Sequence, residues 1–220
     1  MPVWSSMFTQ NSNSPMMENL LFFHDHIMVI LILVLMITGL MGIMSLIQDS
    51  FYIFSSESQE MEIFWSTLPS IILLMIAVPS LKLLYFMEEN SFSSLSFKVI
   101  GHQWYWSYEY SEFSMFGMDS FMISDCPRNL MTDNHLVLPS LTPLRFLLTS
   151  TDVIHSWTVP SMGVKMDAVP GRINQFYLNI DRVGISSGQC SEICGMNHSF
   201  MPITLSIIPL SDFISSLGSL

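Results

Sequence analysis

The chain has 220 residues, of which half are apolar and only 11% are charged, against roughly 25% charged residues in an average soluble domain. Its formal charge of −11 argues against nucleic-acid binding, which depends on neutralising phosphates, but it suits a basic protein partner. Three cysteines cannot all pair within one chain, which disfavours a disulfide framework.

Residues 1–90 predict an N-terminal segment and a transmembrane helical hairpin. Residues 27–47 form an uncharged run of 21 residues, long enough to cross a hydrocarbon core of about 30 Å. A second uncharged run covers residues 63–81 and contains two prolines, which membrane helices tolerate. Pro15 follows Asn13 and Ser14 and favours a helix start near that point. We expect both ends of the hairpin on the same side of the lipid bilayer.

Residues 91–220 have a different pattern, in which short β-branched and aromatic segments alternate with Pro, Gly, Ser and Asp. Such a pattern is typical of a sandwich or barrel. The predicted strands cover residues 97–100, 104–110, 135–138, 144–149, 173–180 and 201–208. We therefore expect one all-β domain in this part of the chain.

The segment GQCSEICGMNHSFMP, residues 188–202, gathers sulfur and imidazole groups at the spacing C-x3-C-x3-H-x2-M. These groups belong to Cys190, Cys194, His198 and Met201, and His155 lies 35 residues before Cys190. Soft sulfur ligands combined with imidazole suit copper. A mononuclear blue-copper site needs only one cysteine, so the second thiolate favours two copper ions bridged by both sulfurs.

Three other interpretations of the loop stay open at this point. A Cys190–Cys194 disulfide would make the chain a membrane-anchored structural or binding protein. A zinc site could use both cysteines with His155 and His198, but zinc would leave the thioether without a role. A cysteine nucleophile with a histidine base lacks an evident substrate pocket. Cys126 lies outside the pattern and is expected to be a free or buried thiol.

The segment GHQWYWSYEY, residues 101–110, holds two Trp and three Tyr. The spacing favours a strand whose aromatic side chains pack on a core or at a membrane interface. The functional alternative is an exposed Trp above the metal site that offers a contact surface and a point where electrons enter.

Acidic residues suggest two further sites, each with an ordinary surface as the alternative. Glu109, Glu112, Asp119, Asp133 and Asp152 are candidates for an acidic docking face, although a solvated surface gives the same pattern. Glutamates 60 and 62 stand at the mouth of the second span, where a carboxylate can admit protons or simply lie in the interface.

These motifs together resemble the cytochrome c oxidase subunit II family over nearly the whole chain. The resemblance lies in HDH (24–26), QEMEIFWSTLP (59–69), GHQWYWSYEY (101–110), DVIHSWTVPSMGVKMDAVPGR (152–172) and GQCSEICGMNHSFMPI (188–203). It implies a two-helix membrane hairpin followed by a cupredoxin-like Greek-key barrel that holds a binuclear copper A centre. It also implies the mitochondrially encoded form, in the mitochondrial inner membrane with the C-terminal domain facing the intermembrane space; a bacterial plasma membrane is the alternative.

The resemblance implies the following copper A ligands: His155, Cys190, the carbonyl of Glu192, Cys194, His198 and Met201. The two thiolates would bridge both copper ions. The carboxylate of Glu192 would bind a magnesium ion at the boundary with subunit I.

By the same resemblance, the chain would accept electrons from reduced cytochrome c through Trp104. It would pass them to haem a and to the haem–copper B site of subunit I, where oxygen is reduced and protons are pumped. Glu109, Asp133 and Asp152 would belong to the docking face for cytochrome c, and Glu62 to the mouth of a proton path. Subunit I, other oxidase subunits and the lipid bilayer are the remaining partners. A quinol-oxidase subunit of the same fold is disfavoured, because it would lack the copper ligands present here.

Overall fold

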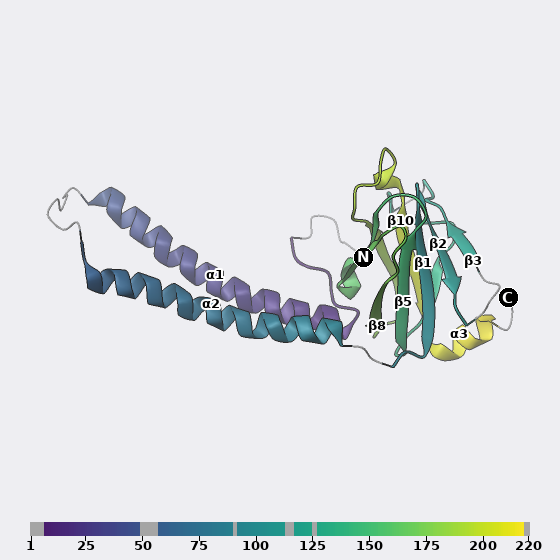
Figure 1. Cartoon of the computed structure of the whole chain (residues 1–220), viewed down its shortest axis with the longest axis horizontal. Helices are drawn as coiled ribbons and strands as arrows, with labels where there is room; N and C mark the ends of the chain where they lie inside the picture. Colours follow the sequence, from purple (N-terminus) through teal and green to yellow (C-terminus); the bar gives the residue numbers. More distant parts are fainter. Residues whose placement is uncertain (1–6, 49–56, 90–91, 113–116, 125–126, 218–220) are drawn as a thin grey trace. The chain divides into compact units, whose positions relative to one another are not determined.

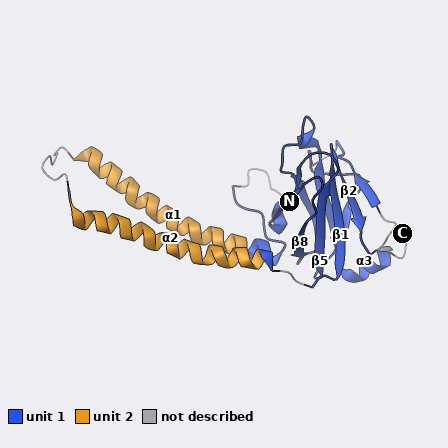
Figure 2. Cartoon of the chain, in the orientation of Figure 1, with its two compact units in different colours: residues 1–18, 88–220 blue, residues 19–87 orange. Residues whose placement is uncertain are grey.

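The computed structural model describes residues 7–48, 57–89, 92–112, 117–124 and 127–217, so the prediction for Cys126 lies outside the described residues. The chain divides into two compact units, residues 1–18 with 88–220 and residues 19–87 (Figure 2). The first 18 residues therefore group with the β-rich unit. The domain division predicted from the sequence, near residue 90, had placed them with the hairpin.

The hairpin consists of two helices, α1 (Pro15–Ile47) and α2 (Gln59–Glu88). Both are long and apolar enough to cross a membrane. Helix α1 begins at the predicted proline, and the Ser14 hydroxyl caps it by accepting a hydrogen bond from the Met17 N–H at 3.0 Å, as N-cap serines do. Both prolines of the second apolar run lie within α2. The two predicted spans are thus parts of longer helices.

The β-rich unit contains two five-stranded sheets (Figure 1). The first sheet has the order β3 (Gly117–Ser120), β2 (Tyr105–Tyr110), β1 (Leu95–His102), β5 (Pro143–Ser150) and β8 (Asn174–Asn179). The second has the order β4 (Leu136–Pro139), β10 (Pro202–Ile208), β9 (Gly184–Cys190), β6 (His155–Val159) and β7 (Val164–Ala168). A short helix, α3 (Leu210–Leu217), follows the last strand. In each sheet one pair is parallel, β1 with β5 and β10 with β4, and the other pairs are antiparallel.

Alternate residues of the strands build the core between the sheets. Burial alternates strictly along β2 and β5, as expected where one face of a strand packs inward. The largest fully buried side chains include Trp106, Tyr108, Phe146 and Trp157. The all-β expectation for residues 91–220 is confirmed, and each predicted strand overlaps an observed one.

Four strands, β3, β6, β7 and β9, have no counterpart among the predicted strands. Strand β9 reads GISSGQC and has only one residue, Ile185, of the β-branched and aromatic types that mark strands. Its formation depends on close packing, because a Cβ atom at Gly188 would collide with the backbone carbonyl of Thr158 in β6. Strand β9, which ends at the predicted ligand Cys190, therefore forms because it packs closely against β6 and not because its residues favour strands.

Candidate metal centre

Two segments that are distant in sequence, the start of β6 and the stretch from the end of β9 to Met201, meet at one end of the second sheet. His155 is the first residue of β6, and Cys190 is the last residue of β9. The two strands pair with Trp157 opposite Cys190, which brings the imidazole beside the thiol. The loop after β9 contains Cys194 and continues through the 3₁₀ helix η2 (His198–Phe200) to Met201, immediately before β10.

The donor atoms of the predicted ligands lie close together. The ligand atoms of His155, Cys190 and Cys194 are all within 4.8 Å of one another. The Cys194 sulfur lies 3.4 Å from Nδ1 of His198 and 3.5 Å from the Met201 sulfur. A further donor is the carbonyl oxygen of residue 192, which lies 3.3 Å from the Cys190 sulfur. The structure therefore brings all six predicted copper ligands into one cluster.

The centre of this cluster is shielded from water. His155 is 0% exposed, Met201 1%, Cys194 3% and Cys190 8%, whereas His198 and Glu192 are half-buried. Both cysteines are free thiols. Two buried sulfurs, a thioether and imidazole nitrogens form a soft donor set, which suits copper better than magnesium or calcium.

The pKa values of the two thiols are shifted in opposite directions. Burial alone would raise the pKa of Cys190, but hydrogen bonds, chiefly with His155, hold that pKa below its usual value. Burial and the neighbouring charge of Cys190 raise the pKa of Cys194 to about 12. Because a thiol coordinates as a thiolate, metal binding at this cluster would release the proton of Cys194.

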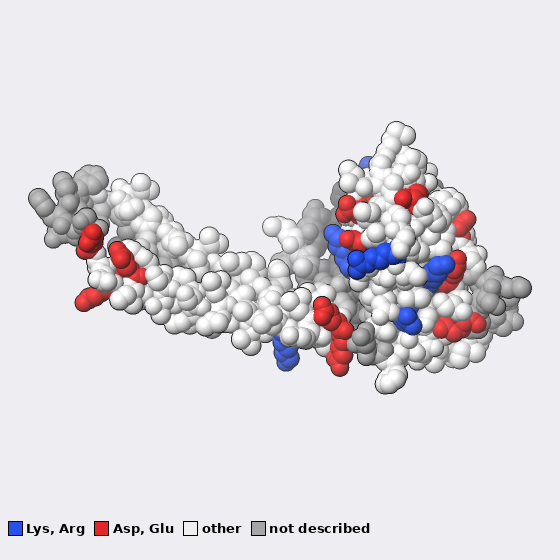
Figure 3. Space-filling view, in the orientation of Figure 1, with Lys and Arg blue, Asp and Glu red and all other residues white. Residues whose placement is uncertain are grey.

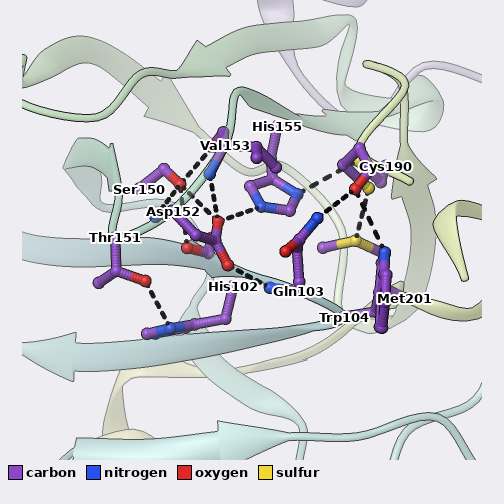
Figure 4. A network of polar contacts seen from close by, with 12 residues as sticks. His102, Gln103, Trp104, Ser150, Thr151, Asp152, Val153, His155, Cys190 and Met201 are labelled. Atoms are coloured by element: carbon purple, nitrogen blue, oxygen red, sulfur yellow. Dashed lines mark hydrogen bonds and ion pairs between the residues drawn. The ribbon is translucent and has the colours of Figure 1, made fainter. Parts of the chain in front are cut away.

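Asp152 lies beside the cluster and orients one of its imidazoles (Figure 4). Its Oδ1 is 2.9 Å from Nε2 of His155. A carboxylate can only accept a hydrogen bond, so Nε2 carries the hydrogen and Nδ1 is left facing the Cys190 sulfur at 4.0 Å. Burial opposes ionisation of Asp152, but hydrogen bonds from His155 and from the N–H groups of Val153 and Gln103 lower its pKa. The i, i+3 spacing of Asp152 and His155 was the available sequence signal for this contact.

Glycine at position 101 makes room for this imidazole. A Cβ atom there would lie 2.8 Å from a ring carbon of His155, closer than side chains approach one another. On another side, the Trp106 ring meets the imidazole edge-on, with centroids 5.8 Å apart. The ring of His155 is thus fixed by packing as well as by hydrogen bonding, a level of support typical of metal-binding histidines.

Comparison with known proteins identifies the family to which these features belong. Residues 95–208 match the family model "Cytochrome C oxidase subunit II, periplasmic domain", and residues 2–83 match "Cytochrome C oxidase subunit II, transmembrane domain". The chain belongs to the cytochrome c oxidase subunit II family. Cytochrome c oxidase subunit 2 of Choristoneura rosaceana is 50% identical and that of Drosophila melanogaster 48% identical, each over 100% of this chain and 99% of the relative.

Solved structures of subunit II confirm the cupredoxin-like fold of the β-rich unit. The periplasmic domain of subunit II (CoxB) of Bradyrhizobium japonicum is 40% identical, with a TM-score of 0.57, and the match covers 59% of this chain and 94% of that chain. A mixed disulfide intermediate between a thioredoxin-like protein and subunit II of cytochrome c oxidase contains a chain that is 39% identical. Its TM-score is 0.54, over 60% of this chain and 94% of that chain.

The aromatic segment of this subunit II chain has two structural roles. Trp106, Tyr108 and Tyr110 are buried in the core. Trp104 is half-buried and donates a hydrogen bond from Nε1 to the carbonyl of Cys194 at 3.3 Å, beside the Gln103 side chain, which donates to the same oxygen at 2.8 Å. The segment therefore supplies three residues to the core and places the half-buried Trp104 against the cysteine loop. A role of Trp104 in electron entry stays a prediction.

Trp104 also packs closely on the turn after Cys194. Gly195 has φ of +122°, a conformation that side chains rarely adopt. A Cβ atom at Gly195 would come within 3.2 Å of the Trp104 ring. The cysteine loop of this subunit II chain can therefore approach the indole only because a glycine occupies that position.

The acidic residues assigned to a docking face all have local partners. Glu109 forms an ion pair with Lys98 at 2.9 Å across β1 and β2. Asp133 accepts hydrogen bonds from the N–H groups of residues 121 and 134, both at 2.7 Å. On the face of the β-rich unit shown in Figure 3, acidic and basic residues are interspersed. The docking role of these residues stays a prediction.

Glu62 lies in the first turn of α2 and is exposed. It belongs to the hairpin unit rather than to the unit that holds the cysteine cluster. Its place in a proton path stays a prediction, as does magnesium binding by the carboxylate of Glu192.

Proposed function

We propose that this member of the subunit II family is the electron-accepting subunit of a cytochrome c oxidase. The chain takes single electrons from reduced cytochrome c and passes them to haem a and the haem–copper B site of subunit I, where oxygen reduction is coupled to proton pumping. The observation that carries this proposal is the buried cluster of soft donors around Cys190 and Cys194. Both sulfurs are free, buried and close to imidazole nitrogens.

The residues present fit a binuclear copper A centre. Cys190 and Cys194 would hold both ions. His155 with Met201, and His198 with the carbonyl of Glu192, would complete the ligand set. When bound, the centre supplies a one-electron carrier. The chain itself excludes water from the sulfurs and fixes the tautomer of His155, so that its Nδ1 remains available for coordination.

Trp104 is our candidate for the contact through which electrons enter. Its indole is partly accessible and donates a hydrogen bond to the backbone carbonyl of Cys194. The thiolate of the same residue is one of the proposed ligands. A covalent and hydrogen-bonded connection therefore runs from the surface of the β-rich unit to a ligand. Aromatic side chains of this kind often dominate protein contacts energetically.

We extend the proposal to the remaining sites of the subunit. The carboxylate of Glu192 binds magnesium at the boundary with subunit I. Glu109, Asp133 and Asp152 contribute to cytochrome c docking, and Glu62 stands at the mouth of a proton path. The protein lies in the mitochondrial inner membrane with the β-rich unit in the intermembrane space. Relatives of about half identity come from insects, which supports the mitochondrial rather than the bacterial location.

Replacement of Trp104 tests the proposed electron path. In full-length protein reconstituted with copper, Trp104→Ala should slow electron transfer from reduced cytochrome c by about 30-fold, as truncation of an interface tryptophan worth about 2 kcal/mol would. Stopped-flow absorbance measures the rate, and metal analysis checks that the copper content is unchanged. Trp65→Ala, in helix α2, is the matched control and should transfer at the wild-type rate. An unchanged rate in Trp104→Ala would contradict the assigned role.

A further inference from the structure

A groove of about 390 Å³ lies between α1 and α2 within the hairpin unit, and the proposed electron path does not use it. On α1 it is lined by Phe22, Phe23 and His26, and on α2 by Lys82 and Phe86. Residues separated by three or four positions share a helix face. The two helices therefore turn a polar group and aromatic rings towards the same space.

The two ionisable groups of the groove, His26 and Lys82, lie at the same level of the hairpin. His26 directly precedes the uncharged run 27–47, and Lys82 directly follows the uncharged run 63–81. Because the chain reverses direction between the runs, both residues mark the polar boundary at the open end of the hairpin. Lysine side chains at such boundaries extend their ammonium groups towards lipid headgroups.

The charge of the groove is positive, and the lining of the groove contains no group that would neutralise it. Lys82 is the only basic residue in residues 1–90. None of the residues lining the groove is acidic. Among the residues that the structure describes, the ion pairs involve other side chains, and none includes Lys82. A ligand with a negative headgroup would therefore meet a complementary charge, whereas the ammonium of a zwitterionic headgroup would find no carboxylate in the lining.

Most of the remaining wall of the groove is apolar, and three of its residues are phenylalanines. Phe22 is 68% exposed and Phe86 is 42% exposed, and both lie next to the polar boundary in sequence. Phenyl rings at this depth can pack against the first segment of an acyl chain. The groove thus combines a cation with an apolar surface, which is the combination that a phospholipid requires.

We propose that this groove binds an anionic phospholipid. The phosphate group would be held by the Lys82 ammonium and the imidazole N–H of His26, and an acyl chain would lie along the rings of Phe22, Phe23 and Phe86. Basic pockets between transmembrane helices recognise anionic lipid headgroups by this chemistry. The proposal depends on membrane insertion of the hairpin and is independent of the electron-accepting role of the β-rich unit.

Native mass spectrometry of the full-length chain in mild detergent tests the headgroup. Equal amounts of phosphatidylglycerol and phosphatidylcholine are added. We expect phosphatidylglycerol to bind about fivefold more tightly, the factor that one lysine near a membrane surface contributes. Lys82→Gln should abolish this preference, and Lys82→Arg should keep it. Lys98→Gln, which removes a lysine of β1 in the other unit, is the matched control and should leave the preference intact.

A second pair of variants tests the apolar wall. Phe86→Ala should weaken the binding of both phospholipids, whereas Phe64→Ala, an exposed phenylalanine of α2 outside the groove lining, should not. Equal binding of the two lipids by the wild-type chain, or an unchanged preference in Lys82→Gln, would overturn the proposal. So would displacement of phosphatidylglycerol by millimolar inorganic phosphate, which would indicate a simple anion site. A photo-crosslinker at position 86 that captured a helix of another subunit instead of lipid in the assembled oxidase would also overturn it.

Discussion

Asp152 shows how a residue that looks like surface charge in the sequence can belong to the site. Four groups donate hydrogen bonds to its carboxylate, among them the imidazole of a proposed copper ligand. The same imidazole has a raised pKa: burial opposes its charge, but the contacts with Cys190 and Asp152 outweigh burial. The carboxylate is therefore placed to position His155, whatever it contributes to docking.

The clustered donor residues could be predicted from sequence, but, apart from Asp152, the residues that hold them in place could not. The spacing of Cys190, Cys194, His198 and Met201 places four donors within one short stretch of the chain, so local sequence contains the signal. The hydrogen bonds from Gln103 and Trp104 to the Cys194 carbonyl join residues about ninety positions apart. Such contacts exist only once the sheets have assembled, and no spacing rule applies to them.

Replacement of Asp152 separates positioning from docking. Asp152→Asn should lower the copper affinity of the full-length chain by about 10- to 100-fold, the usual effect of removing a carboxylate that orients a metal-bound histidine. Competition with a copper chelator measures the affinity. Asp133→Asn, which alters another hydrogen-bonded carboxylate, should leave the affinity unchanged. A purely docking role for Asp152 would instead lower the rate with cytochrome c at unchanged copper affinity.

At the scale of elements, strands with an apolar or aromatic pattern could be predicted and strands that depend on fit could not. Strands β2 and β5 follow the alternation of buried and partly exposed residues that strand rules expect. Strand β9 is rich in serine and glycine and forms because Gly188 allows close approach to β6. The helices were predictable because an uncharged apolar run of this length rarely forms any structure other than a membrane-spanning helix.

Tyr110 links the two sheets through its hydroxyl. The hydroxyl donates to the carbonyl of Val137 in β4 at 3.1 Å and accepts from the N–H of the same residue at 3.2 Å. Burial, only partly offset by the hydrogen bond to Val137, raises the pKa of Tyr110 to about 12. An unfolded tyrosine ionises at a pKa of about 10. The stabilising contribution of this group is therefore complete below about pH 10 and is lost as the pH rises towards 12.

Tyr110→Phe should lower the free energy of unfolding at pH 7 by about 1 kcal/mol, because it removes two partly buried hydrogen bonds to the backbone of Val137. The variant should also lose less stability than the wild type between about pH 10 and pH 12. The variant should still lose some stability at alkaline pH, because the pKa of Tyr108 is also raised by burial. Urea unfolding followed by tryptophan fluorescence measures both quantities. Half-buried Tyr177 provides the control, since Tyr177→Phe should change neither the stability at pH 7 nor its loss at alkaline pH. If Tyr110→Phe lost as much stability as the wild type at alkaline pH, the interpretation would be contradicted.

At the scale of the whole molecule, the β-rich unit includes a segment that precedes the hairpin in sequence. The N–H of Asn13 donates to the carbonyl of Ser161 at 2.7 Å, and the Ser14 hydroxyl donates to the carbonyl of Met162 at 2.7 Å. The same serine caps α1. Hydropathy divides the chain near residue 90 because it detects apolar runs, and it contains no information about contacts between residues separated by about 150 positions.

The copper content of the full-length chain tests the central claim most directly. After reconstitution under reducing conditions, metal analysis should find two copper ions per chain. Cys194→Ser should bind fewer than two, because one of the two proposed thiolate ligands is lost. Cys126→Ser, which lies outside the predicted ligand pattern, should still bind two. Fewer than two copper ions in the fully reconstituted wild-type chain, or an undiminished content in Cys194→Ser, would contradict a binuclear copper centre in this loop.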